Sequence, residues 1–434
     1  MEAIRIRGGS PLTGHVRISG AKNAALKLMA AALMAPDCSV IRNVPDIEDV
    51  RSMIGVLEGV GARVRWLDPG VLEVDARSEP SGFPPDELVR RMRASVQVMG
   101  PLLARTGGVR VSLPGGCAIG VRPLDLHQKG FQRLGARIEE HHGYIWARGD
   151  ALRGGDIVLD LPSVGATENI MTCAVLARGT TVIRNAAREP EVVELARFLQ
   201  RMGARVYGAG TDTIRVEGVS RLHGCDYTVM PDRIEAGTFL AAAAATGGDV
   251  EIDQVIPEHL EAVTAKLAEA GAHVWRSGPT SLRLRRDPGR RLRPFVVRTQ
   301  PYPGFPTDMQ AQFTVLAAVA DGVSVIAERI YTSRFKHVDE LMRMGADIMV
   351  DGPTAVVRGV SQLTGAAVEA SDLRAGAALV IAGLAARGET WVEGVHHIDR
   401  GYEDFCRKLR GLGAHIERVP AREARAEPAR RAHA

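Results

Sequence analysis

The stretch GVGARVRWLDPGVLEVDA (59–76) decides the fold, because related stretches recur five more times along the 434 residues. These are RLGARIEEHHGYIWARG (133–149), RMGARVYGAGTDTIRVEG (201–218), EAGAHVWRSGPTSLRLR (269–285), RMGADIMVDGPTAVVRG (343–359) and GLGAHIERVP (411–420). Each follows an amphipathic helix such as EVVELARFLQ (191–200), which the Gly-Ala pair can cap. The residues after the pair alternate as in a strand, a turn and a second strand. The pattern predicts six copies of one α/β module.

The spacing of the repeats predicts two homologous halves. The repeated glycines lie at intervals of 74, 68, 68, 74 and 68 residues: Gly61, Gly135, Gly203, Gly271, Gly345 and Gly413. A period near 70 is too long for an ordinary solenoid, so each repeat is interpreted as a module of two helices and several strands. Because the 74–68 pattern occurs on both sides of the middle interval, we expect three modules in each half.

The sixth repeat lacks its last strand, and the N-terminus can supply it. EAIRIRGG (2–9) is similar to TIRVEG (213–218), the strand that closes the third repeat. We therefore expect one domain over 22–231, a second over 1–21 plus 232–420, and a disordered tail over 421–434. Two lobes that the chain joins twice form a hinged pair, and ligands favour the cleft of such a pair.

The composition is typical of a globular protein and argues against several other classes of protein. Apolar residues make up 45% and charged residues 24%, with a net charge of +4. A nucleic-acid binder more often carries a basic stripe. The five scattered cysteines form no CxxC pair, which argues against a zinc site or a disulfide framework and suits a reducing cytoplasm. With neither a signal peptide nor an apolar run of about 18 residues, we expect a cytoplasmic protein without membrane insertion.

Two loop-like segments in the first half carry reactive groups. SGAKNAALK (19–27) places Lys22 and Asn23 at a helix start, where backbone amides favour an anion; the alternative is a solvated lysine. LPGGCAIGVRPLDLH (113–127) places Cys117 five residues before Arg122, a neighbour that favours the nucleophilic thiolate. The alternative for Cys117 is an inert, half-buried thiol.

The second half has two further groups of candidates. In PGFPTDMQAQF (303–313), Asp308 is either a base or, as is commoner for such an aspartate, a helix N-cap. The segments TSRFKH, ASDLRAG and HHIDRGYEDF contribute Arg334, Asp372, Arg374 and Arg400. Each of these four alone reads as a surface or salt-bridged residue. The three arginines among them, together with Lys22, Arg93 and Arg122, would suit a small ligand that carries several negative charges.

These segments together resemble the enolpyruvyl transferase family, over nearly the whole chain up to about Pro420. The matching stretches are SGAKNAALK (19–27), RASVQVMGPL (93–102), LPGGCAIGVRPLDLH (113–127), SVGATENIM (163–171), NAAREPE (185–191), PDRIEAGTF (231–239), FPTDMQAQF (305–313), SRFKHVDEL (333–341), SDLRAGAAL (371–379) and HIDRGYE (397–403). The resemblance implies an α/β fold of two inside-out α/β barrels, each built from three βαβαββ-type units.

The resemblance also implies an activity. Members similar to this chain move the enolpyruvyl group of phosphoenolpyruvate to the 3′-hydroxyl of UDP-N-acetylglucosamine and release phosphate, the first committed step of peptidoglycan synthesis. No cofactor and no metal is implied, and a monomer is favoured over an oligomer. A sister enzyme uses shikimate 3-phosphate as acceptor, but the cysteine loop and SVGATENIM favour the sugar nucleotide. A retired paralogue that only binds sugar nucleotide is the other alternative.

The family motifs imply a role for each matching residue. Cys117 would be the general acid and the site of a covalent phosphoenolpyruvate adduct, and Asp308 the base. Lys22, Arg122 and Arg400 would hold phosphoenolpyruvate, with Asn23, Arg93 and Ile330 near the sugar nucleotide. The uridine diphosphate would be lined by Arg122, Pro123, Leu124, Asp125 and Leu126 and by Leu161, Pro162, Ser163 and Val164. Arg334, Asp372 and Arg374 would support closure and charge. Leu161 departs from the family, which carries a lysine there.

Overall fold

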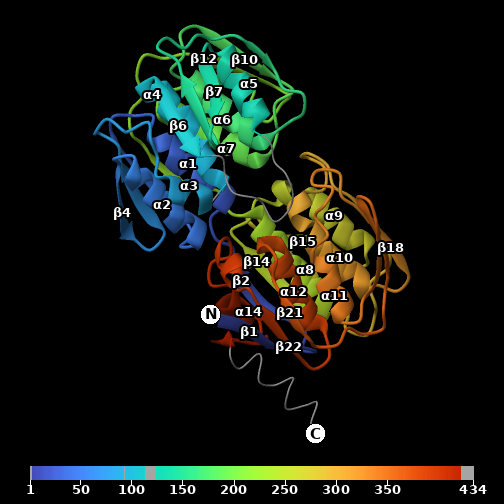
Figure 1. The fold of residues 1–434 in the computed structure, drawn as a ribbon. Coiled ribbons are helices and arrows are strands. Elements are labelled where there is room, and N and C mark those ends of the chain that lie inside the picture. Colours follow the sequence, from blue (N-terminus) through green and yellow to red (C-terminus); the bar gives the residue numbers. More distant parts are fainter. Residues whose placement is uncertain (1, 92, 113–123, 422–434) are drawn as a thin grey trace. The chain divides into compact units, whose positions relative to one another are not determined.

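The computed structural model describes residues 2–91, 93–112 and 124–421, which divide into two compact units (Figure 1). The C-terminal unit contains residues 2–19 and 231–421. The N-terminal unit contains the remaining described residues, from Gly20 to Met230. The chain therefore leaves the C-terminal unit after Ser19 and returns to it at Pro231. Cys117, Arg122 and Pro123, and the expected tail from Arg422 onward, lie outside the described residues.

Three inner helices form the centre of the C-terminal unit: α8 (Arg233–Thr246), α10 (Gln310–Ala318) and α12 (Leu373–Ala385). They pack against one another, and nearly all their side chains are buried. Helices that are apolar all round belong in a core, and their many alanines allow close approach. Figure 1 shows the strands of this unit arranged around them.

Three four-stranded sheets surround these helices, in the orders β2-β14-β16-β15, β17-β18-β20-β19 and β21-β22-β1-β23. Their strands are β1 (Glu2–Arg7), β2 (Thr13–Arg17), β14 (Asp249–Asp253), β15 (His273–Gly278), β16 (Ser281–Arg285), β17 (Val296–Arg298), β18 (Val323–Ala327), β19 (Asp347–Asp351), β20 (Thr354–Arg358), β21 (Ala367–Glu369), β22 (Glu389–Glu393) and β23 (His415–Pro420). Each sheet has one parallel pair of strands and two antiparallel pairs.

The remaining helical segments of the C-terminal unit connect these strands. They are η2 (Pro257–Leu260), α9 (Glu261–Glu269), η3 (Thr307–Met309), α11 (His337–Arg343), α13 (His396–Asp399) and α14 (Phe405–Gly411). Aromatic side chains join the layers: the rings of Phe239 on α8 and Phe405 on α14 meet edge to face, 5.7 Å apart. Burial of one such ring stabilises the fold by about 1.5–3 kcal/mol.

The N-terminal unit repeats the same plan. Its helices are α1 (Lys22–Ala32), α2 (Glu48–Gly59), α3 (Asp86–Arg91), η1 (Arg93–Val98), α4 (Met99–Thr106), α5 (Asp125–Arg133), α6 (Val164–Ala174) and α7 (Pro190–Arg201). Its strands are β3 (Cys38–Arg42), β4 (Arg63–Asp68), β5 (Val71–Asp75), β6 (Gly108–Ser112), β7 (Arg137–His141), β8 (Tyr144–Arg148), β9 (Asp156–Val158), β10 (Thr180–Arg184), β11 (Arg205–Tyr207), β12 (Thr213–Glu217) and β13 (Asp226–Thr228). The sheet orders are β13-β3-β5-β4, β6-β8-β7 and β9-β10-β12-β11.

The six repeats read from the sequence correspond to the six sheets found among the described residues. The Gly-Ala pairs end the outer helices α2, α5, α7, α9, α11 and α14, and all six glycines have a left-handed φ, from 89° at Gly345 to 102° at Gly61. That conformation is costly for residues with a Cβ atom. β1 lies between β22 and β23 and pairs antiparallel with both. The expectations of a mixed α/β fold and of an N-terminal strand completing the sixth repeat are therefore confirmed.

A close contact between α4 and α6 gives a test of this packing. A Cβ atom added at Gly100 would lie 2.4 Å from the backbone oxygen of Asn169. We expect Gly100→Ala to destabilise the N-terminal unit by about 1–3 kcal/mol, because neither backbone can move away easily. Gly411→Ala is the matched control, since its Cβ atom would meet no heavy atom within 4 Å. Equal unfolding midpoints in urea for the two variants would contradict this packing.

Among the described residues, no helix combines the length and the apolar character that crossing a membrane requires.

Candidate functional site

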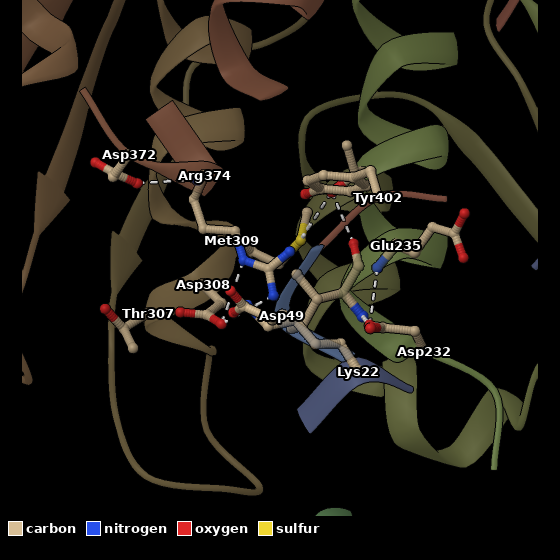
Figure 2. Close-up of polar contacts among 12 residues, drawn as sticks. Lys22, Asp49, Asp232, Glu235, Thr307, Asp308, Met309, Asp372, Arg374 and Tyr402 are labelled. Atoms are coloured by element: carbon tan, nitrogen blue, oxygen red, sulfur yellow. Dashed lines mark hydrogen bonds and ion pairs between the residues drawn. The ribbon is translucent and has the colours of Figure 1, made fainter. Parts of the chain in front are cut away.

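Asp308 lies in the C-terminal unit, on the short turn η3 that leads into α10. Arg334 Nη1 donates to Asp308 Oδ1 at 2.8 Å, and Arg374 Nη2 donates to Asp308 Oδ2 at 3.1 Å. Figure 2 shows Arg374 reaching the carboxylate of Asp308. The arginine side chains are only 6% and 4% exposed, against 25% for Asp308. The structure thus brings three predicted site residues into one buried charge cluster, in which each carboxylate oxygen accepts from a guanidinium.

The first turn of α12 holds Arg374 in place. The helix is capped by Asp372, whose Oδ1 accepts from the backbone N–H groups of Arg374, at 2.9 Å, and Ala375, at 3.1 Å. Such a cap contributes about 1 kcal/mol. The Arg374 guanidinium also lies 5.4 Å from the ring centroid of Tyr402 (Figure 2). Asp372 is therefore a helix cap, and not the surface or salt-bridged residue expected of it when read alone.

Tyr402 is buried and extends the cluster toward α8. Its hydroxyl and that of Thr238 are 2.9 Å apart, and Gln312 Nε2 donates to Thr238 at 3.1 Å. Burial raises the pKa of Tyr402. Its aromatic ring lies against the Arg374 guanidinium as a cation–π partner.

Two further candidates in this unit lie on loops. Ile330 follows β18 and is 37% exposed. Arg400 directly follows α13 and is half-buried. Burial, followed by the charges of His396 and Arg400, lowers the pKa of His397, so the positive charge of Arg400 acts on this histidine.

In the N-terminal unit, Lys22 begins α1 and is buried. Its Nζ lies 2.6 Å from Asp49 Oδ2, in the first turn of α2, and the two side chains are 10% and 5% exposed. Asn23 follows and is half-buried. The alternative of a solvated lysine is therefore wrong. The cation and the carboxylate at this helix start form a charged pair that is largely removed from water. Charge interactions are stronger in such an environment than in water.

The predicted diphosphate segments are also placed in this unit. Leu124 and Leu126 are buried and Asp125 is exposed at the start of α5, while Arg93 begins η1. Leu161 is 56% exposed. Pro162, Ser163 and Val164 are half-buried, and Ser163 caps α6 by accepting from Ala166 N at 3.4 Å.

A buried polar network lies next to these segments and was not anticipated. Asn169 Nδ2 donates to Val96 O at 2.9 Å and lies 3.1 Å from His127 Nδ1, while Asn169 Oδ1 accepts from Gly100 N at 2.6 Å. Glu168 is fully buried, 3.2 Å from Lys27 Nζ. Burial raises the pKa of Glu168 to about 7, although Lys27 acts in the opposite direction. The network joins α6 to η1, α4 and α5, and its signal was a run of polar residues, TEN, inside an otherwise apolar helix.

Chemically, each unit presents groups for an anionic ligand. Guanidinium groups bind phosphate and carboxylate, a buried lysine binds either, and a carboxylate such as Asp308 can accept a proton. Within the described part of the chain, no three His, Cys, Asp or Glu side chains gather in a way that could hold a metal ion.

His337 begins α11 and lies next to the charge cluster of Asp308, Arg334 and Arg374. Its titration gives a prediction about the pH dependence of stability. Burial lowers its pKa to about 4; Asp372 opposes this shift and Arg334 adds to it. The unfolded chain takes up this proton below about pH 6.5 whereas the folded protein does not, so stability is lost as the pH falls through that window. We expect a loss of about 2 kcal/mol between pH 7 and pH 5 from this group.

His337→Leu should flatten this acid loss, measured as urea unfolding midpoints at the two pH values. His273→Gln, at an exposed position on β15, is the control and should keep the wild-type slope. An equally steep loss in His337→Leu would show that other groups cause it.

The family model and the two relatives described here, all similar to this chain, are described as carboxyvinyltransferases. The family model described as EPSP synthase (3-phosphoshikimate 1-carboxyvinyltransferase) matches residues 6–409. UDP-N-acetylglucosamine 1-carboxyvinyltransferase 2 of Carboxydothermus hydrogenoformans is 55% identical over 96% of this chain and 100% of its own length. UDP-N-acetylglucosamine 1-carboxyvinyltransferase 1 of Symbiobacterium thermophilum is 56% identical over 95% of this chain and 94% of its own.

Solved structures of enolpyruvyl transferases are also similar to this chain. The crystal structure of the enolpyruvyl transferase NikO from Streptomyces tendae has a TM-score of 0.87 at 26% identity and covers 96% of this chain and 99% of its own. EPSP synthase from Acinetobacter baumannii has a TM-score of 0.73 at 18% identity, with 97% and 100% covered, and shares the fold. The family resemblance carried by the motifs is therefore confirmed, and the chain belongs to the EPSP synthase family of enolpyruvyl transferases.

Proposed function

We propose that this protein transfers the enolpyruvyl group of phosphoenolpyruvate to the 3′-hydroxyl of UDP-N-acetylglucosamine, releasing phosphate, in peptidoglycan synthesis. The observation that carries this proposal is the 51–56% identity, over at least 94% of the chain, to relatives named UDP-N-acetylglucosamine 1-carboxyvinyltransferase. The buried pairing of Asp308 with two arginines and of Lys22 with Asp49 supports it, because the reaction handles phosphate and carboxylate groups.

In the proposed mechanism, Cys117 donates a proton to the methylene carbon of phosphoenolpyruvate. The 3′-hydroxyl then forms a bond to the adjacent carbon while Asp308 takes its proton. A tetrahedral ketal results. The Cys117 thiolate then takes back a methyl proton as the carbon–oxygen bond to phosphate breaks, which forms the enol ether and releases phosphate. Lys22, Arg122 and Arg400 hold the phosphate and carboxylate of the substrate. Arg334 and Arg374 keep the Asp308 carboxylate in place.

The sugar nucleotide is assigned to the remaining candidates. Asn23, Arg93 and Ile330 lie near the sugar, and the uridine diphosphate is lined by residues 122–126 and 161–164. Leu161 lacks the positive charge that the family lysine would give, so the diphosphate is held without a cation at this position. The finer fold assignment belongs to the same proposal: two inside-out α/β barrels of three units each, over 22–231 and over 1–21 plus 232–420. The packing of inner helices inside surrounding sheets supports it.

The description of the family model favours a second acceptor, shikimate 3-phosphate. Phosphate release by the purified protein with phosphoenolpyruvate and each acceptor in turn separates the two. We expect release with UDP-N-acetylglucosamine and background release with shikimate 3-phosphate or with no acceptor. Release with the shikimate acceptor alone would replace the proposal by the second function.

A further inference from the structure

Glu328, at the end of β18, has a fully buried side chain that the proposed mechanism leaves without a role. Its Oε1 accepts from the Thr299 hydroxyl at 2.7 Å and from the backbone N–H groups of Ile330, at 2.8 Å, and Tyr331, at 2.9 Å. Its Oε2 accepts from the Thr307 hydroxyl at 2.9 Å. A buried acceptor with several donors is costly to disturb, because each donor would lose its partner away from water.

One oxygen of Glu328 fixes the backbone after β18. The N–H groups of Ile330 and Tyr331 both point to Oε1, so the loop turns around the carboxylate. Thr299 reinforces the turn, since its hydroxyl oxygen accepts from Arg329 N at 2.8 Å while donating to the same Oε1. The position of Ile330, which the proposed function places near the sugar nucleotide, therefore depends on Glu328.

The other carboxylate oxygen of Glu328, Oε2, is connected by hydrogen bonds to the proposed base, Asp308. Thr307 Oγ1 donates to Glu328 Oε2 and accepts from Arg334 Nη1 at 2.9 Å. The same Nη1 donates to Asp308 Oδ1 at 2.8 Å. A guanidinium can only donate and a hydroxyl carries one hydrogen, so Glu328 sets the direction of the Thr307 hydroxyl. That hydroxyl in turn presents its lone pair to Arg334.

We propose that Glu328 is a positioning residue for the transfer reaction, which acts on the acceptor loop through Ile330 and on the proposed base through Thr307 and Arg334. The inference rests on the proposed function. It predicts two separable effects from one buried carboxylate: a change in turnover through the Thr307 arm and a change in sugar-nucleotide binding through the loop arm.

Thr307→Val tests the first arm, because it removes the hydroxyl and leaves the Glu328 contacts to Thr299, Ile330 and Tyr331. We expect kcat to fall about 10- to 100-fold, with KM for UDP-N-acetylglucosamine changed less than about threefold. Thr307→Ser retains the hydroxyl and should restore kcat to within about threefold of wild type. Thr314→Val is the matched control; its buried hydroxyl donates to Gln310 O within α10, and its kcat should remain that of wild type.

Glu328→Gln tests both arms together. The amide nitrogen must face either Thr307, which then loses its acceptor, or the two backbone N–H groups, which then meet a donor. We expect a fall in kcat like that of Thr307→Val, together with a KM for UDP-N-acetylglucosamine raised about tenfold. Circular dichroism and melting curves establish folding, and if Glu328→Gln does not fold, the two Thr307 variants decide the matter.

Each negative result has a distinct meaning. An active wild-type enzyme with folded Thr307→Val as fast as wild type, or with Thr307→Ser as slow as Thr307→Val, would overturn the positioning role alone. A folded Glu328→Gln with an unchanged KM would remove the loop arm. A wild-type protein that transfers nothing to UDP-N-acetylglucosamine would overturn the proposed function, and this inference with it.

Discussion

Asp308→Asn is expected to lower kcat about 10²- to 10⁴-fold, the range by which a positioned proton acceptor accelerates a reaction. Asparagine has nearly the same shape but cannot take the proton of the sugar hydroxyl. It also leaves the guanidiniums of Arg334 and Arg374 without the carboxylate that both contact. KM for phosphoenolpyruvate should change much less than kcat, because the lost interaction is made in the transition state.

Steady-state phosphate release measures this effect, at a temperature where circular dichroism shows the variant folded. Asp321→Asn is the matched control, since Asp321 pairs with Arg291 at 3.0 Å but is 74% exposed. Its activity should equal that of wild type, because an exposed ion pair contributes only about 0–1 kcal/mol. A kcat for Asp308→Asn within threefold of wild type would rule out Asp308 as the base.

Lys22→Met has the second large expected effect, a loss of about 10³-fold in kcat/KM for phosphoenolpyruvate. The substitution removes a buried cation and leaves Asp49, 2.6 Å from Lys22 Nζ in the present structure, to repel the anionic substrate. The lost attraction to Lys22 and the new repulsion from Asp49, at about 2 kcal/mol each, together lower kcat/KM by roughly three powers of ten. The protein should also lose stability, because the buried Asp49 carboxylate loses the cation that lies beside it.

The double variant Lys22→Met/Asp49→Asn separates these causes. It should recover stability, since the buried carboxylate charge beside position 22 is gone, and yet bind phosphoenolpyruvate poorly because the cation is still missing. Lys266→Met, on the outer helix α9, removes a more exposed lysine and should leave kcat/KM unchanged. Near-normal kcat/KM in the double variant would mean that Lys22 serves stability and not the substrate.

Local sequence patterns predicted the repeats well because the responsible forces are local. A residue that must end a helix with φ near +90° favours glycine, so the six Gly-Ala pairs mark six helix ends before any tertiary contact is known. The N-terminal strand was also predictable, because an alternating apolar pattern predicts a strand and the sixth repeat lacked one.

The partners of charged residues were not predictable, since they depend on elements brought together by the fold. Lys22 could be read as solvated because Asp49 comes from a different helix. Asp308 fits the pattern of an N-cap, yet η3 and α10 carry no side-chain cap hydrogen bond, whereas Asp372 caps α12. Glu328 follows an ordinary strand, and nothing in AERI indicates that its carboxylate is buried among four donors.

The most direct test of the proposed transfer is the identity of the product. Phosphoenolpyruvate labelled with carbon-13 at its enol carbon is incubated with the wild-type protein and UDP-N-acetylglucosamine, and the product is analysed by NMR. We predict that the label appears in an enol ether bonded to the 3′ oxygen of the sugar, with an NMR coupling between the labelled carbon and the 3′ proton. One phosphate should be released per ether formed. Phosphate release with the label recovered as free pyruvate would mean hydrolysis without transfer, and would contradict the account.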